Sequence, residues 1–311
     1  MTTGVVTKAD ALAAVEDVIG SGKFGLVSEA KNLWPAASLV PIPGNVGWNT
    51  DASTYAGDFN KEVILAQKFT PTQDYNGNND SNRWLVMMGM RQLNYTPYGK
   101  GWGACTVTPH YLTKFPEGDS RLAASVIDLE GEGIAQGNDF NSSFADWREY
   151  TGYTVKKYSP LVYGNGLPGT NADGTAGFQE CNANQWVIMR YADVLLMAAE
   201  LGSGNAANYM HLVRERAGLG DIAVNQQNIM DERARELAFE GHRYWDLLRQ
   251  GVDVAADAIA ASAGDVYNGG VKNSVAYDKS KIIATKGLSQ IPENEITLSN
   301  GVLKQNPGWG K

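Results

Sequence analysis

The strongest constraint on the fold is a run of three helix-forming stretches between residues 185 and 250. The first, residues 185–202, is apolar on nearly all sides, which is typical of a helix buried among other helices. The second, residues 206–220, ends near Gly218, and the third, residues 225–250, repeats hydrophobic residues at spacings of three and four. Three helices joined by short links predict packed helical hairpins, so this region should form an α-helical scaffold.

The third stretch also concentrates charge in the segment RELAFEGHRYWDLLRQ, residues 235–250. Glu236 and Glu240 are four residues apart and repel each other unless cations lie between them. Two carboxylates four residues apart on one helix face have poor geometry for an acid/base pair across a substrate, and the three histidines of the chain fit no zinc motif. We therefore predict a buried network of ion pairs that locks helices together. Its predicted members are Arg190, Arg214, Arg233, Glu236, Glu240 and Arg243.

Local pairs are expected beside this network, between Asp246 and both His242 and Arg249.

Composition excludes other classes of site. With 26 Lys and Arg against 34 Asp and Glu, the net charge of -8 excludes a general nucleic-acid surface, because such a surface needs many cations. No stretch approaches the length of a membrane span. The two cysteines, Cys105 and Cys181, fit no metal motif, and whether they are bonded stays open.

Residues 72–102 form a long segment rich in Asn, Gly, Asp and aromatic residues. Irregular segments of this length are usually functional or disordered. Aromatic faces stack on the C–H surfaces of sugars, while amide, carboxylate and guanidinium groups bond the hydroxyls. The predicted ligand-binding residues are Trp102, Tyr75, Trp84, Tyr98, Trp48, Asn78, Asp80 and Arg83. YGKGWG, which holds Tyr98 and Trp102, is expected to be an exposed loop, whereas WLVMMGM suggests that Trp84 begins a buried strand.

The stretch DYNGNND alternates side-chain oxygens as calcium loops do. Asp74, Asn76, Asn78 and Asp80 would be the ligands, but the glycine comes early and Leu85 stands where the bidentate glutamate is required. We therefore expect a solvated turn, with calcium as the alternative. No other cofactor is indicated by the sequence.

Several stretches resemble, in order, segments of the SusD/RagB family. IMDERARELAFEGHRYWDLLRQG resembles the family's signature helix. VTKADALAAVEDVIGSGKFGL, FADWREYTGYTVKKY, QWVIMRYADVLLMAAE and LVRERAGL resemble four further segments. LSQIPENEITLSNGVLKQNPGW resembles the family's ending, with Gln290 where a proline is usual. These matches extend across most of the chain.

The resemblance implies a mainly α, SusD-like fold, in which a scaffold of TPR-type helices carries long irregular loops and a few short strands. Because family members are longer, the chain is expected to correspond to their C-terminal part, with the N-terminal part absent. The expected divisions are a helical-repeat segment (1–33), a ligand-facing loop region (34–184), a helical scaffold (185–255) and an extended tail (256–311). The first helix, residues 8–19 with Thr7 as N-cap, would then expose an apolar patch.

The resemblance also implies a function without catalysis. Family members capture oligosaccharide or polysaccharide at the bacterial cell surface and deliver it to a SusC-like TonB-dependent transporter of the outer membrane. They begin with a secretion signal and a lipid-modified cysteine, neither of which this sequence shows. Contact with a membrane is therefore expected only through a lipid anchor outside this chain.

Three alternatives stay open. A peptide-binding relative of the family would use the same scaffold. A glycoside hydrolase would need carboxylates on loops, such as Asp51, Asp58 or Asp119, although Asp119 is expected to pair with Arg121. An interaction module would bind only a protein. The sequence does not name the glycan, because linkage specificity depends on the relative placement of loops.

Overall fold

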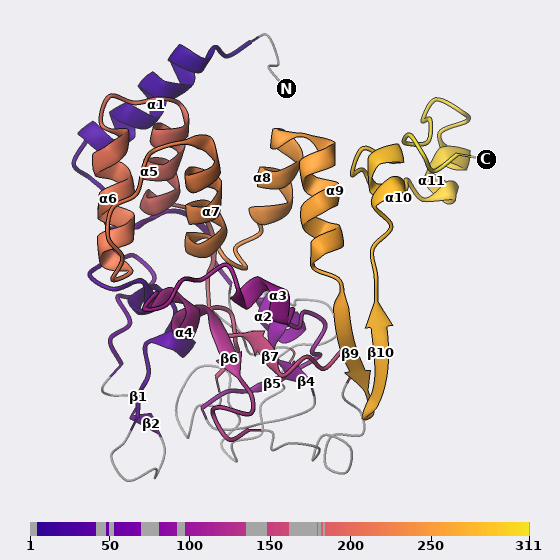
Figure 1. Ribbon diagram of the computed structural model, residues 1–311, viewed down its shortest axis with the longest axis horizontal. Helices are drawn as coiled ribbons and strands as arrows, with labels where there is room; N and C mark the ends of the chain where they lie inside the picture. Colours follow the sequence, from indigo (N-terminus) through magenta and orange to yellow (C-terminus); the bar gives the residue numbers. More distant parts are fainter. Residues whose placement is uncertain are drawn as a thin grey trace.

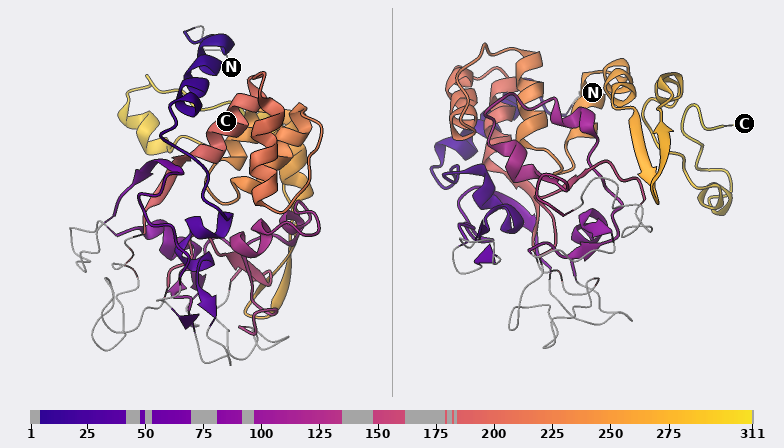
Figure 2. Two further views of the ribbon diagram at one scale, coloured as in Figure 1. Left: turned by 90° about the vertical axis from the view of Figure 1, so that its left-hand side faces the viewer. Right: turned by 60° about the horizontal axis from the view of Figure 1, so that its bottom comes forward.

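The polypeptide folds into two layers, one of helices and one of shorter elements (Figure 1). The computed structural model describes residues 5–41, 48–49, 53–69, 81–91, 97–134, 148–161, 179, 182 and 184–310. In this part of the chain the helices are numerous and the strands have two to five residues each. The predicted mainly α fold with few short strands is therefore confirmed. Figure 2 shows the same division from two further directions.

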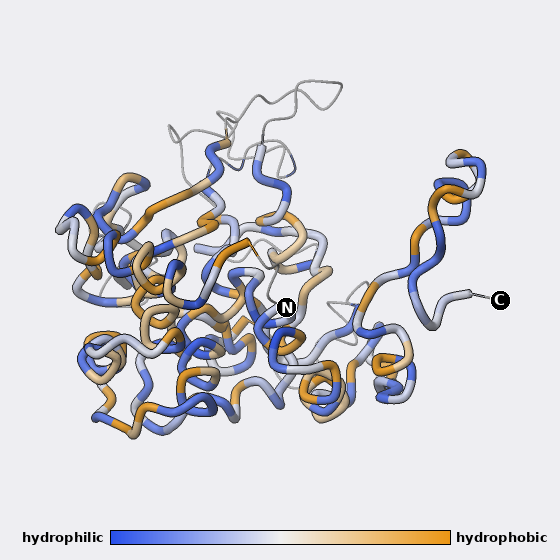
Figure 3. The backbone as a smooth tube through the Cα atoms, turned by 90° about the horizontal axis from the view of Figure 1, so that it is seen from above, coloured by the Kyte–Doolittle hydropathy of each residue, from blue (hydrophilic) through white to orange (hydrophobic). Residues whose placement is uncertain are grey.

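The helical layer is a row of neighbouring helices. It consists of α1 (Lys8–Gly20), α5 (Tyr191–Glu200), α6 (Ala206–Arg216), α7 (Gln226–Glu236), α8 (Arg243–Gln250) and α9 (Val252–Ala261). Helix α5 contacts α1, α6 and α7, while α8 contacts α7 and α9. Leu195, Leu196, Met210 and Val213 fill the interior between α5 and α6 and are at most 1% exposed. Hydrophobic and hydrophilic residues alternate around these helices (Figure 3), as expected for helices that bury one face.

Helix α1 begins where its sequence predicts. Thr7 Oγ1 accepts a hydrogen bond from the Asp10 N–H (3.1 Å), and the Asp10 carboxylate accepts one from the Thr7 N–H (3.1 Å). This reciprocal cap satisfies two N–H groups of the first turn. Val15 and Ile19 pack against the interior of α5 and α6. No residue of α1 is fully buried, so its apolar face is covered only in part, and the expected exposed patch stays a prediction.

The first of the three predicted helices is only half helical. Residues Trp186–Arg190 form strand β8, and α5 starts at Tyr191. Strand β8 pairs antiparallel with β3 (Val63–Gln67), so that Trp186 lies opposite Gln67 and Arg190 opposite Val63. A continuous run of apolar residues does not distinguish a buried strand from a buried helix. Residues 186–190 form a strand because they hydrogen-bond to β3.

The third predicted helix is interrupted, so the continuous stripe expected over residues 225–250 is wrong. Helix α7 ends at Glu236 and α8 begins at Arg243. Between them, Phe239 and Gly241 have φ angles of 64° and 87°. An α-helix cannot contain these left-handed conformations, and Gly241 adopts one at little cost because it has no Cβ.

The second layer consists of short elements. Its helices are α2 (Arg83–Met88), α3 (Pro109–Leu112) and α4 (Arg121–Ser125), with the 3-10 turns η1 (Ala30–Leu33) and η2 (Pro35–Ala37). Its strands, besides β3 and β8, are β1 (Val40–Pro41), β2 (Trp48–Asn49), β4 (Met90–Arg91), β5 (Lys100–Gly101), β6 (Val126–Asp128) and β7 (Tyr153–Val155). Strands β1 and β2, and β6 and β7, pair antiparallel, whereas β4 and β5 pair parallel.

The C-terminal region is folded, in contrast to the expected extended tail. Strands β9 (Gly264–Asn268) and β10 (Val271–Val275) form a hairpin closed by Gly269 and Gly270, with φ angles of 52° and 80°. Two-residue hairpin turns favour such positive angles. The hairpin reaches from the helical row to the second layer (Figure 1). Helices α10 (Lys279–Ala284) and α11 (Glu293–Leu298) follow at one end of the molecule.

Candidate functional site

Four aromatic rings form a row from the interior to the surface of the second layer. Trp34 meets the edge of Tyr158 with a centroid distance of 5.0 Å, and Tyr158 stacks on Trp186 at 4.2 Å and 21°. Trp186 then contacts Trp84 at 5.7 Å. Trp34 and Tyr158 are each 2% exposed, whereas Trp84 is 49% exposed. We call these four residues the aromatic row. Its inner rings support an outer ring that solvent reaches.

Asn82 fixes the outer end of the aromatic row. It is fully buried, and its Oδ1 accepts a hydrogen bond from the Trp84 N–H (3.0 Å), which caps α2. Its Nδ2 donates to the carbonyl of Asn184 (2.8 Å), and its N–H donates to the carbonyl of Asn182 (2.7 Å). One residue therefore holds the start of α2 against the segment that leads into β8. These bonds bring Trp84 beside Trp186. The sequence pattern had not identified Trp186 as part of a site.

The structure reverses the predicted exposure of two candidates. Trp84 is the second residue of helix α2, where a buried strand was expected, and half of its surface is exposed. Tyr98 is 1% exposed and packs in a core cluster with Met90 and Ile127. Its hydroxyl donates to Glu132 Oε2 (2.9 Å). The Tyr98 ring is thus part of the interior, so its assignment to an exposed ligand-binding loop is wrong.

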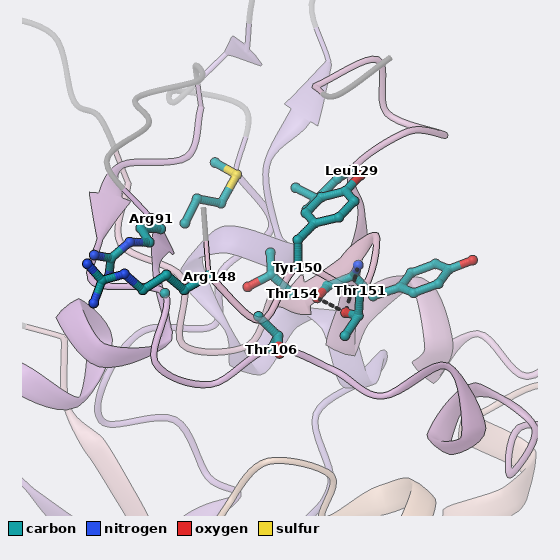
Figure 4. A pocket seen from close by; sticks show the side chains of 10 residues that line it. Arg91, Thr106, Leu129, Arg148, Tyr150, Thr151 and Thr154 are labelled. Atoms are coloured by element: carbon teal, nitrogen blue, oxygen red, sulfur yellow. Dashed lines mark hydrogen bonds between the residues drawn. The ribbon is translucent and has the colours of Figure 1, made fainter. Parts of the chain in front are cut away.

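Trp102 is partly exposed and lies after β5. Its backbone is held by two segments, because its N–H donates to the Val86 carbonyl (2.7 Å) and its carbonyl accepts from Arg91 Nη1 (2.9 Å). Arg91 lines a small pocket with Arg148 and Tyr150. Figure 4 shows both arginines extending to one side of this pocket, with Tyr150 and Leu129 on the opposite side.

The remaining candidates are placed only in part. Arg83 is partly exposed next to Trp84 at the start of α2. Trp48 lies in β2, where only the backbone is described. Tyr75, Asn78 and Asp80 lie outside the described residues, as do the other two candidate calcium ligands, Asp74 and Asn76. Their proposed roles stay predictions.

The charged cluster of the sequence is an interior network centred on Arg190. Its Nη1 donates to Glu62 Oε1 (2.9 Å) and to Glu236 Oε1 (2.6 Å), and its Nε donates to Glu240 Oε2 (2.7 Å). Arg190, Glu236 and Glu240 are at most 4% exposed. One arginine therefore bridges the two glutamates that repel each other, and the break after α7 lets Glu240 reach it.

Other charged residues extend this ion-pair network. Arg121 contacts Asp119 (2.7 Å), Glu232 (2.5 Å) and Glu236 (3.0 Å). Lys157 contacts Glu240 (2.8 Å). Because Lys157 directly precedes Tyr158, this contact connects the network to the aromatic row. The additional pairs are Arg214–Glu232, Arg216–Glu62, Arg216–Glu236 and Arg235–Glu232. Asp119 lies against Arg121 as the sequence suggested, so it is not a free loop carboxylate.

Two predicted members lie elsewhere. Arg233 does not meet Glu236 but contacts Asp193 (2.6 Å) and Asp246 (2.9 Å). Arg243 makes no ion pair with any residue that the structure describes, because it starts the separate helix α8. Arg214 contacts Glu232 and does not lie between Glu236 and Glu240. Asp246 meets Arg249 (2.9 Å) as predicted, but the hydrogen bond to His242 is a backbone one.

Several network members had no local signal in the sequence. Glu62, Lys157 and Arg216 are far from one another along the chain, so no spacing rule connects them. Glu232 is different, because it precedes Glu236 by four residues, just as Glu236 precedes Glu240. The four-residue repeat of glutamates could have extended the prediction to Glu232.

The cations keep the buried glutamates ionised. Burial raises the pKa of Glu236, but Arg216, Arg190 and Arg121 outweigh it and hold the pKa well below its usual range. Burial also raises the pKa of Glu240, but Arg190 and Lys157 outweigh it, so the pKa of Glu240 is lowered. A general acid needs the opposite shift, toward neutral pH. The network therefore has the properties of a structural element.

The described residues give no sign of a metal centre or a membrane span. Among them, no group of three or more His, Cys, Asp or Glu could hold a metal ion. Within the same residues, every helix is too short or too polar to cross a bilayer. The outer end of the aromatic row carries an exposed ring on a supported frame, and it is the candidate site for ligand contact.

Comparison with known proteins agrees with this architecture. SusD-like protein P2 of Formosa agariphila is 24% identical over 265 residues, which cover 76% of this chain and 48% of that protein. Surface glycan-binding protein A from Bacteroides fluxus is 25% identical, with a TM-score of 0.69 over 97% of this chain and 59% of that one. A laminarin-binding SusD-like protein is also 25% identical, with a TM-score of 0.66 over 97% and 59% of the two chains.

The chain spans about half the length of the curated relatives it matches. The family model described as the SusD family matches residues 61–309, which is most of the chain. This match includes the aromatic residues Trp84, Tyr158 and Trp186 and all of the ion-pair network. On this ground the chain belongs to the SusD family.

Proposed function

We propose that this protein captures oligosaccharide without catalysis and that Trp84 is the principal contact. The observation that carries the proposal is the half-exposed Trp84 ring, held against Trp186 and backed by the stacked Tyr158. A ring that is already held loses little conformational entropy when a sugar stacks on it. Arg83, the neighbouring residue on α2, is partly exposed and supplies a guanidinium group for sugar hydroxyls.

The similar proteins support a glucan as the first ligand class to test. One of them is named for binding laminarin, a β-glucan, and another is named as a surface glycan-binding protein. We propose that the present chain acts in the same setting, at the cell-surface side of a bacterial outer membrane. Delivery of the bound glycan to a SusC-like TonB-dependent transporter is the further step of this proposal. Its support is membership of the SusD family.

The first test is affinity electrophoresis on a panel of polysaccharides that includes laminarin. We expect one polysaccharide to retard the protein and Trp84→Ala to weaken the binding by about tenfold, because loss of one stacking ring costs on the order of 1.4 kcal/mol. Trp245→Ala is the matched control, since Trp245 is 64% exposed on α8 and lies outside the aromatic row.

Two outcomes would contradict the proposal. Equal loss of binding in both variants would show that Trp84 has no special role. Release of reducing sugar by the unmodified protein would show that it is an enzyme. The transporter step is tested separately, by co-purification with the TonB-dependent transporter encoded in the same bacterium; failure to co-purify in the presence of the bound glycan would contradict that step alone.

A further inference from the structure

A pocket separate from the aromatic row lies between the β9–β10 hairpin and the second layer. Its volume is about 490 Å³, which is within the range of about 300–1,000 Å³ typical of small-molecule sites. One wall consists of residues 104–106, 108–110, 149 and 151, and the other consists of residues 262–267, 275 and 277. None of these segments contributes a ring to the aromatic row.

Backbone hydrogen bonds hold the two walls together. Tyr150 and Tyr267 exchange two bonds of 2.9 Å each, and the Glu149 N–H donates to Asn268 Oδ1 (2.8 Å). Glu149 has a φ of 54°, which is strained for a residue with a side chain. Such strain persists only where the surroundings impose it, and it is frequent at binding sites. The pocket is therefore built on a fixed frame.

The lining favours a neutral ligand that carries hydroxyl groups. It includes Tyr267, Tyr277 and four Thr and Ser residues. Of these four, Thr151 and Ser262 donate their hydroxyls to the backbone carbonyls of Val107 and Ile259 and keep acceptor capacity for a ligand. Two carboxylates, Glu149 and Asp265, line it, whereas no Lys or Arg is among its described lining residues. This charge disfavours an anion. Asp265 is already compensated by Lys272 (2.6 Å) and Ser274 (2.8 Å), which reduces the attraction for a cation.

We propose that this pocket binds one neutral sugar unit, independently of the Trp84 surface. The tyrosine rings contact the C–H face of the sugar, and the Glu149 carboxylate accepts hydrogen bonds from its hydroxyls. The site goes beyond the proposed function, because it is a second carbohydrate site on other elements of the fold.

Cys105 provides a reporter inside the pocket. It lines the pocket and is partly exposed. Burial, and then the Glu149 carboxylate, raise the pKa of its thiol, so alkylation is best followed at mildly alkaline pH. The chain has two cysteines, and Cys181→Ser therefore leaves Cys105 as the only thiol.

The experiment measures the rate of Cys105 alkylation by iodoacetamide in the Cys181→Ser protein. Glucose, galactose and mannose are the neutral probes, with glucuronate as the charged one. We expect at least one neutral sugar to slow alkylation, by about fourfold at three times its Kd, because only the free fraction reacts. Tyr277→Ala should abolish this protection, and Tyr277→Phe, which keeps the ring, should retain it.

Two results would overturn the inference. One is an unchanged alkylation rate with all three neutral sugars at tens of millimolar. The other is protection by glucuronate that equals or exceeds that of the best neutral sugar. The readouts keep the two sites apart, because alkylation reports on the pocket and electrophoresis on laminarin reports on the Trp84 surface. Failure of one proposal therefore leaves the other measurable.

Discussion

The ion-pair network and the aromatic row are built alike but end differently. Both join segments that are distant in the sequence, and Lys157 and Tyr158 are adjacent members of the two. In the network each of the central charges meets partners and is almost completely buried. In the row the last ring, Trp84, is left half open. The charged cluster that most resembled an active site in the sequence is therefore part of the protein interior. A ligand-binding residue is better sought where a side chain is held by its neighbours but remains exposed to solvent.

Removing the centre of the network is expected to have the largest effect. Arg190→Met leaves Glu62, Glu236 and Glu240 buried with one cation fewer. Loss of one partner from a buried ion pair costs about 3–5 kcal/mol, because the remaining charge stays without compensation. Urea unfolding should show this decrease. Lys31→Met is the control, since Lys31 and its partner Glu29 are both exposed; a similar loss in both variants would deny the network its structural role.

The two ends of the aromatic row should respond differently to the same substitution. Trp34→Ala removes a ring that is 2% exposed and should lower the free energy of unfolding by about 3 kcal/mol. Trp84→Ala removes a ring that is 49% exposed and should cost less than about 1 kcal/mol while weakening glycan binding. Thermal unfolding measured beside electrophoresis on laminarin separates the two. Equal destabilisation would mean that Trp84 is a packing residue like Trp34.

Acid should lower the free energy of unfolding gradually, because it protonates the carboxylates of the ion-pair network. The pKa values of Glu232, Glu236 and Glu240 are lowered in the folded protein from the ordinary value of 4.5. Their contribution to the free energy of unfolding is therefore complete above pH 4.5 and is lost as the pH falls from there through the lowered pKa values. For each carboxylate, a tenfold weaker affinity for the proton in the folded state corresponds to about 1.4 kcal/mol of this contribution.

Urea unfolding between pH 7 and pH 3 measures this loss. Glu236→Gln should flatten the decline below pH 4.5, because one of the responding carboxylates is gone. A stability that stays constant down to pH 3 in the unmodified protein would contradict the assignment of these carboxylates to the network.

The sequence predicted the elements that depend on neighbours in the chain. The cap of α1 by Thr7 and the pairing of Asp246 with Arg249 are local, and both appear in the structure. The strand at Trp186–Arg190 was missed because its partner β3 lies more than a hundred residues away. The predictions of side-chain exposure were wrong for the same reason. Tertiary neighbours bury Tyr98, whereas they leave half of Trp84 exposed. Residues that meet only in three dimensions carry no spacing signal.

The position of Glu62 has a consequence for biosynthesis. Its carboxylate meets Arg190 and Arg216, which follow it by 128 and 154 residues. During translation from the N-terminus, these partners are made long after Glu62 leaves the ribosome, and Glu236 and Glu240 are made later still. Closing loops of this length is slow. The glutamate therefore stays hydrated while most of the chain is made, and its withdrawal from water coincides with completion of the helical layer.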